Sequence, residues 1–346
     1  MNIFDLVTSS NIVAYWLEKN LNDVTVGDQL FPFQKEIGIK LDWVKGANNQ
    51  PVGLRLSAYD SKAIRRDREG IDEYTAKMPF FKESMVIDEE MRQNLNTLLQ
   101  TQNEALINTI VARIFDDEIK LIKAAKETVE RCRMQLLTSG VLTLASNGQA
   151  YEYDYGMPDA NKITVDKEWS DASADAIQDI IDAQSLAKAK GINLTRAMCA
   201  SECINALLNN TAIKNRIYVL AQGNVTITAN EVVRYLEQTL GITIYVNDNG
   251  YVSENGTFTK YFAPDIFVLM PDGELGKTHY GTTPEESDLM NGGTDAEVSL
   301  VENAIAVTTS KQVDPVNVDT KVSMVMLPSF EMADAVYILD VDPRSV

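Results

Sequence analysis

The chain has 346 residues, of which 45% are hydrophobic and 23% charged, so it is long enough to form two or three folded units with buried cores. Its 31 Lys and Arg residues face 50 Asp and Glu residues, and a surface with a formal net charge of −19 repels the phosphates of nucleic acid. One histidine and three cysteines leave few ligands for zinc, copper or haem, make most catalytic triads implausible and do not form a disulfide framework.

The charge is distributed unevenly along the chain. Residues 1–140 contain 18 basic and 21 acidic side chains, whereas residues 141–346 contain 13 and 29. The one basic cluster lies in the first part and consists of Arg55, Lys62, Arg65, Arg66 and Arg68. We interpret it as a surface that forms ion pairs with an acidic neighbouring subunit. The N-terminus has no signal-peptide pattern, and no apolar run is long enough to cross a membrane.

The first 80 residues show few signs of a core of their own. Residues 1–38 contain scattered apolar side chains, which predicts an arm that packs on something else. Apolar residues alternate in residues 39–44 and again in 52–56, on either side of a turn-rich stretch, so residues 39–75 read as a long hairpin. Such a hairpin is marginally stable alone in water, which favours packing on another part of the chain or on another subunit.

Residues 88–139 give the strongest helical signal. Asp88 is a good N-cap, apolar residues recur every three or four positions, and Gly140 stands at the expected end. An unbroken helix of this length would reach about 75–80 Å. We therefore expect either a break or an element that spans the molecule.

The second half alternates between strand and helix patterns. Asn147-Gly148 predicts a hairpin turn, and residues 172–290 read as a mixed α/β unit. Within it we expect a helix over 174–190, a second helix between the capping box Thr228–Glu231 and Gly241, and a third after a capping box at Thr283. The expected strands are 242–246, 258–262 and 266–270, followed by a return to strand at 298–309, 321–327 and 335–341.

Each motif that could bind an ion or a phosphate fails on spacing. Gly276-Lys277-Thr278 ends like a P-loop but lacks the earlier glycine. Asp248-Asn249-Gly250 with Glu254 does not have the spacing of a calcium loop. Cys132, Cys199 and Cys203 are expected to be buried thiols, because two cysteines four apart without further ligands make a poor metal site.

The titratable side chains also favour structural interpretations. His279 could act as a general base, but no nucleophile motif accompanies it, so we expect a loop histidine. Asp116-Asp117-Glu118 is expected on a solvated helix face with Lys120 and Lys123 as partners. Glu285-Glu286-Asp288 is expected at a helix N-terminus. We therefore expect no catalytic, cofactor-binding or metal-binding residues, and no enzymatic activity.

Several stretches, in order along the chain, resemble the phage major capsid protein E family, the group around the phage lambda coat protein. They are Met134–Val141, Tyr153–Gly156, Trp169 with Asp171-Ala172, Asp175–Ile180, Gly241-Ile242, Tyr251 with Glu254–Gly256, Phe262–Asp265, Tyr280–Glu285, Asp314-Pro315, Leu327–Phe330 and Ala333–Ala335. Each stretch alone is weak, but together they cover nearly the whole chain; residues 1–85 contribute least.

The resemblance implies an α+β protein with the tailed-phage major capsid fold, also called the Johnson fold. Its parts would be an N-terminal arm (1–38), an extended β-hairpin loop (39–80), a peripheral domain with a long spine helix (81–172), an inserted α/β axial domain (173–297) and return strands of the peripheral domain (298–346). It also makes residues 194–200 a strand, with Ser201 as the cap of the next helix.

The resemblance further implies a function in assembly. Pentamers and hexamers would form an icosahedral head shell, first as a procapsid, with the arm and the loop lying over neighbouring subunits and double-stranded DNA enclosed without sequence-specific binding. Assembly would occur in the host bacterial cytoplasm with portal, scaffold and protease proteins and possibly a decoration protein. No removable scaffold segment is visible at Met1, so we expect these proteins to be separate. The alternatives are an encapsulin-type bacterial compartment, a tail tube protein and an enzyme of unknown class.

Overall fold

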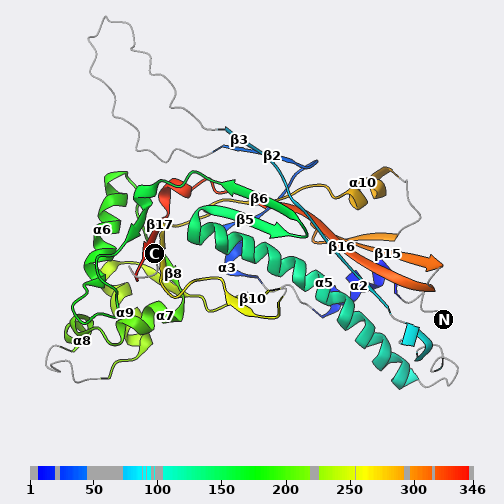
Figure 1. Cartoon of the computed structure of the whole chain (residues 1–346), viewed down its shortest axis with the longest axis horizontal. Helices are drawn as coiled ribbons and strands as arrows, with labels where there is room; N and C mark the ends of the chain where they lie inside the picture. The colour runs from blue at the N-terminus through cyan, green and yellow to red at the C-terminus, as the bar shows by residue number, and fades with distance from the viewer. Residues whose placement is uncertain are drawn as a thin grey trace, which may run out of the picture. The chain divides into compact units, whose positions relative to one another are not determined.

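The computed structural model describes residues 7–19, 24–44, 73–87, 89–90, 92–94, 97, 104–218, 226–253, 255–291, 297–313 and 316–342 (Figure 1). Two compact units are built from interleaved segments of the chain. Unit 1 contains Met1–Asp42, Tyr74–Cys132 and Gly276–Ser329. Unit 2 contains Trp43–Glu73, Arg133–Leu275 and Phe330–Val346. Among the described residues, no helix is both long enough and apolar enough to cross a bilayer.

Unit 1 is built on a sheet whose central strand is β16. Its described strands are β1 (Phe33–Lys35), β4 (Phe80–Val86), β13 (Thr278–Tyr280), β14 (Glu297–Val301), β15 (Ile305–Val313) and β16 (Val316–Pro328). β16 pairs antiparallel with β15 and β4, and its last residues pair with β13. β1 adds to β13 in parallel, so the arm contributes a strand to the sheet.

The predicted strand 298–309 is wrong as a single element. It consists of β14 and β15, which pair with each other across a turn at Glu302 and Asn303. Both turn residues have positive φ, 52° and 55°. Such a turn usually carries glycine, and its absence here hid the turn in the sequence.

The described arm packs on the strands of its own unit, which supply the packing partner that the sequence predicts for it. Its helices are α2 (Ser9–Glu18) and α3 (Val26–Leu30). Ile12, Trp16 and Phe31 are buried, and the Trp16 ring lies 5.3 Å below the ammonium of Lys126. Apolar burial of this size is enough to hold the described arm on its own chain.

The spine helix α5 runs from Glu104 to Ser139 as 36 residues, or about 54 Å at 1.5 Å per residue. It ends as predicted at Gly140, whose φ of 74° is left-handed and whose N–H donates to the Leu136 carbonyl at 2.8 Å. Residues 89–90, 92–94 and 97 are also helical, whereas the predicted cap Asp88 lies outside the described residues. The prediction is therefore confirmed over 104–139.

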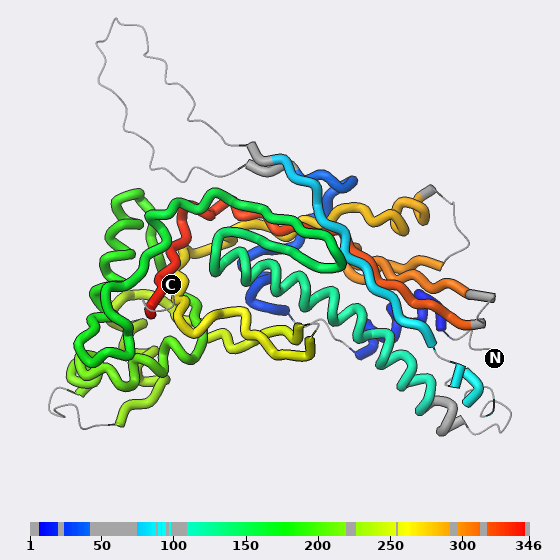
Figure 2. The backbone as a smooth tube through the Cα atoms, in the orientation of Figure 1, coloured from blue at the N-terminus to red at the C-terminus, as the bar shows by residue number. Residues whose placement is uncertain are grey.

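Unit 2 contains a sheet with the described strand order β7-β17-β12-β8-β9. The strands are β7 (Lys162–Thr164), β8 (Arg196–Cys199), β9 (Thr243–Val246), β12 (Ile266–Met270) and β17 (Tyr337–Asp340). The helices are α6 (Ala176–Ala189), α7 (Ser201–Leu207), α8 (Thr211–Ile217) and α9 (Ala229–Leu240), drawn in shades of green in Figure 2. Trp169, Phe267 and Tyr337 are fully buried in one core with side chains from α6, α7 and α9.

Most elements of unit 2 that turn and capping residues predict are confirmed. β5 (Val141–Ser146) and β6 (Gln149–Asp154) pair across Asn147-Gly148. Thr228 and Glu231 form both halves of the capping box of α9, and Gly241 ends that helix with a φ of 66°. The cap predicted at Ser201 is wrong: Ala200 is the N-cap of α7, and the Asp248 carboxylate accepts from the Ser201 N–H instead.

The remaining described elements are two strand pairs, one helix and two short 3-10 helices at Asp159–Asn161 and Ala333–Ala335. β2 (Lys40–Val44) pairs with β3 (Glu73–Lys77), and β10 (Gly250–Val252) pairs antiparallel with β11 (Phe258–Lys260). Helix α10 (Pro284–Asn291) begins at the predicted proline. The predicted strand at 52–56 and the basic cluster from Arg55 to Arg68 lie outside the described residues.

Candidate functional site

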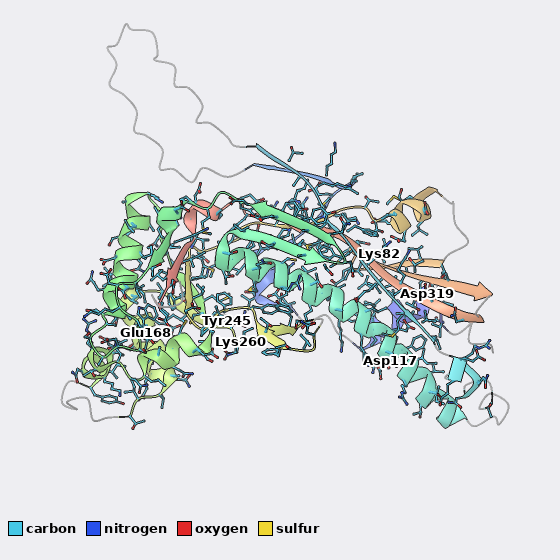
Figure 3. All side chains as sticks on the ribbon, viewed as in Figure 1. Lys82, Asp117, Glu168, Tyr245, Lys260 and Asp319 are labelled. Carbon is cyan, nitrogen blue, oxygen red and sulfur yellow. The ribbon has the colours of Figure 1, made fainter. Side chains whose placement is uncertain are left out.

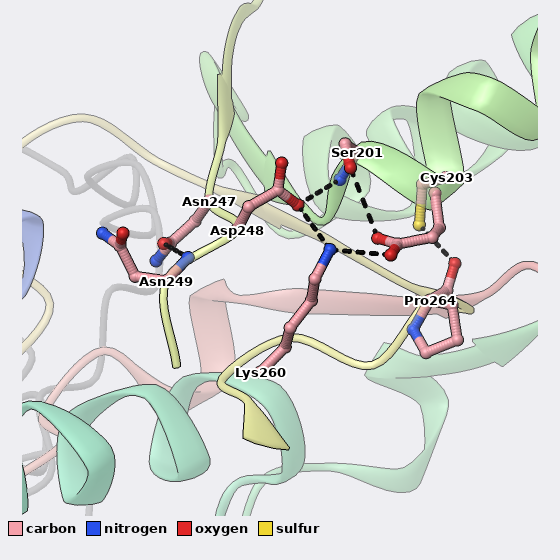
Figure 4. Close-up of polar contacts among 8 residues, drawn as sticks. Ser201, Cys203, Asn247, Asp248, Asn249, Lys260 and Pro264 are labelled. Atoms are coloured by element: carbon pink, nitrogen blue, oxygen red, sulfur yellow. Dashed lines mark hydrogen bonds and ion pairs between the residues drawn. The ribbon is translucent and has the colours of Figure 1, made fainter. Parts of the chain in front are cut away.

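The two segments that resemble phosphate-binding and calcium-binding motifs form contacts within the protein itself. Thr278 opens strand β13 rather than a helix, so the backbone around Lys277 does not form a phosphate cradle. The Asp248 carboxylate accepts from the Ser201 N–H at 3.0 Å and from the Lys260 ammonium at 2.9 Å (Figure 4). These two donors hold the pKa of Asp248 below its usual range. Glu254 lies outside the described residues.

The cysteines are thiols enclosed in the protein. Cys132, Cys199 and Cys203 are all buried and unpaired by disulfides. Contact with Cys203 and burial raise the pKa of the Cys199 thiol, and the Cys203 Sγ donates to the Pro264 carbonyl at 2.9 Å. Both features disfavour the thiolate that a metal or a nucleophilic reaction needs. Within the described residues, no group of three or more His, Cys, Asp or Glu side chains is placed to hold a metal ion.

His279 is not the loop residue that the sequence predicts. It lies in β13, is buried, and contacts Glu36 Oε1 through Nδ1 and Ser329 Oγ through Nε2, each at 3.0 Å. The order Ser–His–Glu is that of a hydrolase triad. However, Ser329 is fully buried and its Oγ also accepts from the Lys277 N–H at 3.1 Å, so the hydroxyl faces protein rather than a substrate. The three residues connect the arm, β13 and the end of β16.

The acidic cluster on α5 is divided between two environments. Asp116 pairs with Lys19 at 2.7 Å and Asp117 with Lys120 at 2.7 Å, as expected for a solvated face. Glu118 contradicts that expectation because it is buried, and its Oε2 has no hydrogen-bond partner among the described residues. Burial raises the pKa of Glu118 to about 7; the Thr320 hydroxyl offsets part of this effect, while Asp117 and Asp319, labelled in Figure 3, add to it.

The second acidic cluster does lie at the start of a helix, and it connects three elements of unit 1. Thr283 Oγ1 accepts from the Glu286 N–H at 3.1 Å, which is half of the expected capping box. The Glu286 carboxylate binds Lys35 of the arm at 2.7 Å instead of completing the box. Glu285 accepts from Lys321 at 2.6 Å and from Ser323 at 2.9 Å, both on β16. These residues therefore fix the arm and α10 to the sheet.

Apolar side chains that remain exposed are the candidate contacts with other proteins. In unit 1 they gather around the arm and β4, and in unit 2 on α6, β9 and the β10–β11 pair. They include Phe33, Ile37, Ile39, Phe80 and Val86 in unit 1, and Ile181, Leu186, Tyr245, Val246, Val252 and Phe258 in unit 2. Clustered apolar groups on a protein surface commonly mark interaction sites.

The chain belongs to the phage major capsid protein E family, whose model matches residues 11–341. It is a major capsid protein, a structural subunit of the icosahedral shell of a phage head, and its place is the virion capsid. This membership makes the encapsulin-type compartment a minor alternative. No curated protein matches the chain in sequence.

Solved structures with the same fold cover almost the entire chain. A protein assigned as the capsid protein of an Escherichia coli CFT073 prophage is 15% identical, with a TM-score of 0.60 over 97% of this chain and 99% of that one. A phage-related protein of Bordetella bronchiseptica RB50 is 12% identical, with a TM-score of 0.54 over 97% of both chains. The capsid protein of cyanophage A-1(L) is 10% identical, with a TM-score of 0.50 over 94% of this chain and 98% of that one. The mixed helix-and-sheet architecture is therefore the predicted Johnson fold of tailed-phage capsid proteins.

Proposed function

We propose that this chain assembles into pentamers and hexamers that close an icosahedral head around packaged double-stranded DNA, without catalysing a reaction. The observation that carries the proposal is the family match over residues 11–341. The net charge of −19 supports the enclosure of DNA without binding. A strongly acidic wall repels DNA phosphates and leaves the packaged molecule free to slide.

Each part of the chain has a proposed place in the shell. Residues 173–297 would form the axial domain, around which the subunits of one capsomer gather. Residues 81–172 and 298–346 would form the peripheral domain, with α5 as its spine. The extended loop, residues 39–80, would lie over a neighbouring subunit. The arm would also lie over a neighbouring subunit; Ile12, Trp16 and Phe31 hold it on its own unit, and its exposed Phe33 and Ile37 support the outward contact.

The proposed partners are those that a head needs in order to assemble and fill. A portal, a scaffold and a protease would act with this chain in the host bacterial cytoplasm, and a decoration protein is compatible with the same shell. Maturation would convert a procapsid into the expanded head.

Negative-stain electron microscopy and sedimentation of the same purified sample test this proposal. Closed shells, or sheets of five- and six-fold capsomers, are the expected result. A uniform small oligomer that never assembles, with or without scaffold, would contradict it. DNA and a portal in native particles would distinguish a phage head from an encapsulin-type compartment.

Reversing the charge of Arg65 and Arg66 is expected to weaken assembly. The basic cluster would face acidic side chains of a neighbour, and Arg65→Glu with Arg66→Glu replaces attraction by repulsion. Because charges at the rim of a contact act mainly on association, we expect the assembly rate at low salt to fall by about ten-fold or more. Added salt screens the new repulsion, so the rate of the variant is expected to recover toward the wild-type rate at high salt. Light scattering during assembly at low and high salt measures this rate.

Arg65→Lys with Arg66→Lys is the matched control, since it keeps the charge. Unchanged assembly kinetics in the Glu variant would refute the ion-pair role of the cluster while leaving the shell itself in place.

A further inference from the structure

The β10–β11 pair presents apolar side chains to solvent at a fixed point of unit 2. Val252 and Phe258 lie directly opposite each other across the two strands and are 61% and 57% exposed. Directly opposed residues point to the same face of a strand pair, so these two form one apolar surface. In Figure 2 the two strands run together as a yellow ribbon that extends from the helices of unit 2.

The base of this ribbon contacts the rest of unit 2. Lys260, at the end of β11, binds Glu202 at 2.6 Å and Asp248 at 2.9 Å, which connects β11 to α7 and to the loop after β9 (Figure 4). Tyr251 and Tyr261 stack with their ring centroids 6.1 Å apart. A short isolated hairpin is only marginally stable in water, and these contacts support the ribbon within the subunit. Binding by a fixed surface loses less conformational entropy than binding by a mobile one.

The charge of the ribbon points to a second copy of this chain as the partner. Residues 250–260 contain one Lys and one Glu, so the ribbon has no net charge, whereas residues 141–346 together carry 13 basic and 29 acidic side chains. Two copies of such an acidic chain repel each other over most of their surfaces and can approach best where the surface is neutral and apolar. Without an excess of basic groups, the ribbon is unsuited to DNA.

We infer that the apolar face of the β10–β11 ribbon, centred on Val252 and Phe258, is a contact between neighbouring subunits of the shell. This inference rests on the proposed function and names one surface through which the subunits would contact each other. The ribbon inserts its two apolar side chains against the adjacent copy, and the Lys260 ion pairs hold it in the orientation required.

Val252→Ser with Phe258→Ser tests the contact in the full-length chain. Both side chains are exposed, so the variant subunit is expected to keep the circular dichroism spectrum and thermal midpoint of the wild type. The concentration of unassembled subunit that remains beside the shells is expected to rise by about ten-fold or more, because two apolar side chains lose their burial. Val252→Ile with Phe258→Leu is the matched control, because it keeps both positions apolar, and its expected change is below about two-fold.

A second measurement uses a thiol as a probe. Since Cys132, Cys199 and Cys203 are buried, Phe258→Cys introduces a thiol that reacts with a maleimide much faster than they do. Its reaction in assembled shells is expected to be about ten-fold slower, or more, than in free subunits.

The results of these experiments distinguish a failure of the proposed contact from a failure of the proposed function. The contact is overturned if the wild type and the serine variant form equally stable shells and the thiol of Phe258→Cys is not protected on assembly. The proposed function would then remain intact. An equal loss of assembly in the control, which keeps both side chains apolar, also overturns the contact, because the effect would then not come from the loss of apolar surface. A wild-type chain that never assembles overturns the proposed function and the contact with it.

Discussion

Between pH 5 and pH 8 the free energy of unfolding is expected to fall by about 2.5 kcal/mol more in the wild type than in Glu118→Gln. The Glu118 side chain is buried between α5 and the sheet of unit 1, and burial raises the pKa of its carboxyl from 4.5 to about 7. Between these two values the folded chain binds more protons than the unfolded chain. The stabilisation is therefore complete below pH 4.5 and is lost as the pH rises through 7.

Urea denaturation of the unassembled subunit at pH 5, 6, 7 and 8, followed by circular dichroism, measures this effect. Many other carboxylates titrate on unfolding, so the informative quantity is the difference between the wild type and Glu118→Gln at each pH. Glu127→Gln, at an exposed position of the same helix, should follow the wild type. A difference that stays constant across the range would show that Glu118 does not titrate as described.

Replacing Gly281 with alanine is expected to cost about 2–3 kcal/mol of stability, because the site has no room for a side chain. A Cβ at this position would lie 2.4 Å from the Gly38 carbonyl oxygen, 2.7 Å from Met78 Cε and 2.8 Å from Val325 Cγ1. The two side chains can move, but the carbonyl belongs to the backbone and accepts from the Thr282 N–H at 2.9 Å. Relief of the clash therefore weakens the contact between Gly38 and Thr282, just beyond the pairing of β1 with β13.

Denaturant unfolding together with limited proteolysis measures the loss, and cleavage near Gly38 is expected to accelerate. Gly273→Ala is the control, because nothing lies within 4 Å of its added Cβ and only its φ of 90° opposes the change, at a cost of about 1 kcal/mol. Equal losses in the two variants would mean that space at Gly281 is not the limiting factor.

Local signals allowed the prediction of those elements whose ends are fixed by neighbouring residues. The Asn147-Gly148 turn, the capping box of α9 and the boundary at Gly140 all depend on contacts within a few residues, and the structure confirms them. The turn at Glu302-Asn303 was missed because Asn303 is typical of left-handed backbone but Glu302 is not, and no glycine accompanies them.

The positions of titratable groups depend on packing between distant segments, and here the sequence was less informative. Glu118 stands four residues after Ile114 and four before Ile122, on the apolar face of α5, and this spacing could have shown its burial. His279 gave no such signal, because Glu36 and Ser329 are 243 and 50 residues away. Likewise, the apolar residues of the arm could not indicate whether it docks on its own chain or on another.

The interleaved course of the chain has a consequence for its synthesis. β16 is the central strand of unit 1, and β17 joins β7 and β12 in unit 2, so each sheet needs a strand that is synthesised after most of its neighbours. A nascent chain on the ribosome cannot complete unit 1 before residues 316–328 emerge, or unit 2 before residues 337–340 emerge. A chain that stops before β16 therefore completes neither sheet, and one that stops between β16 and β17 lacks the sheet of unit 2.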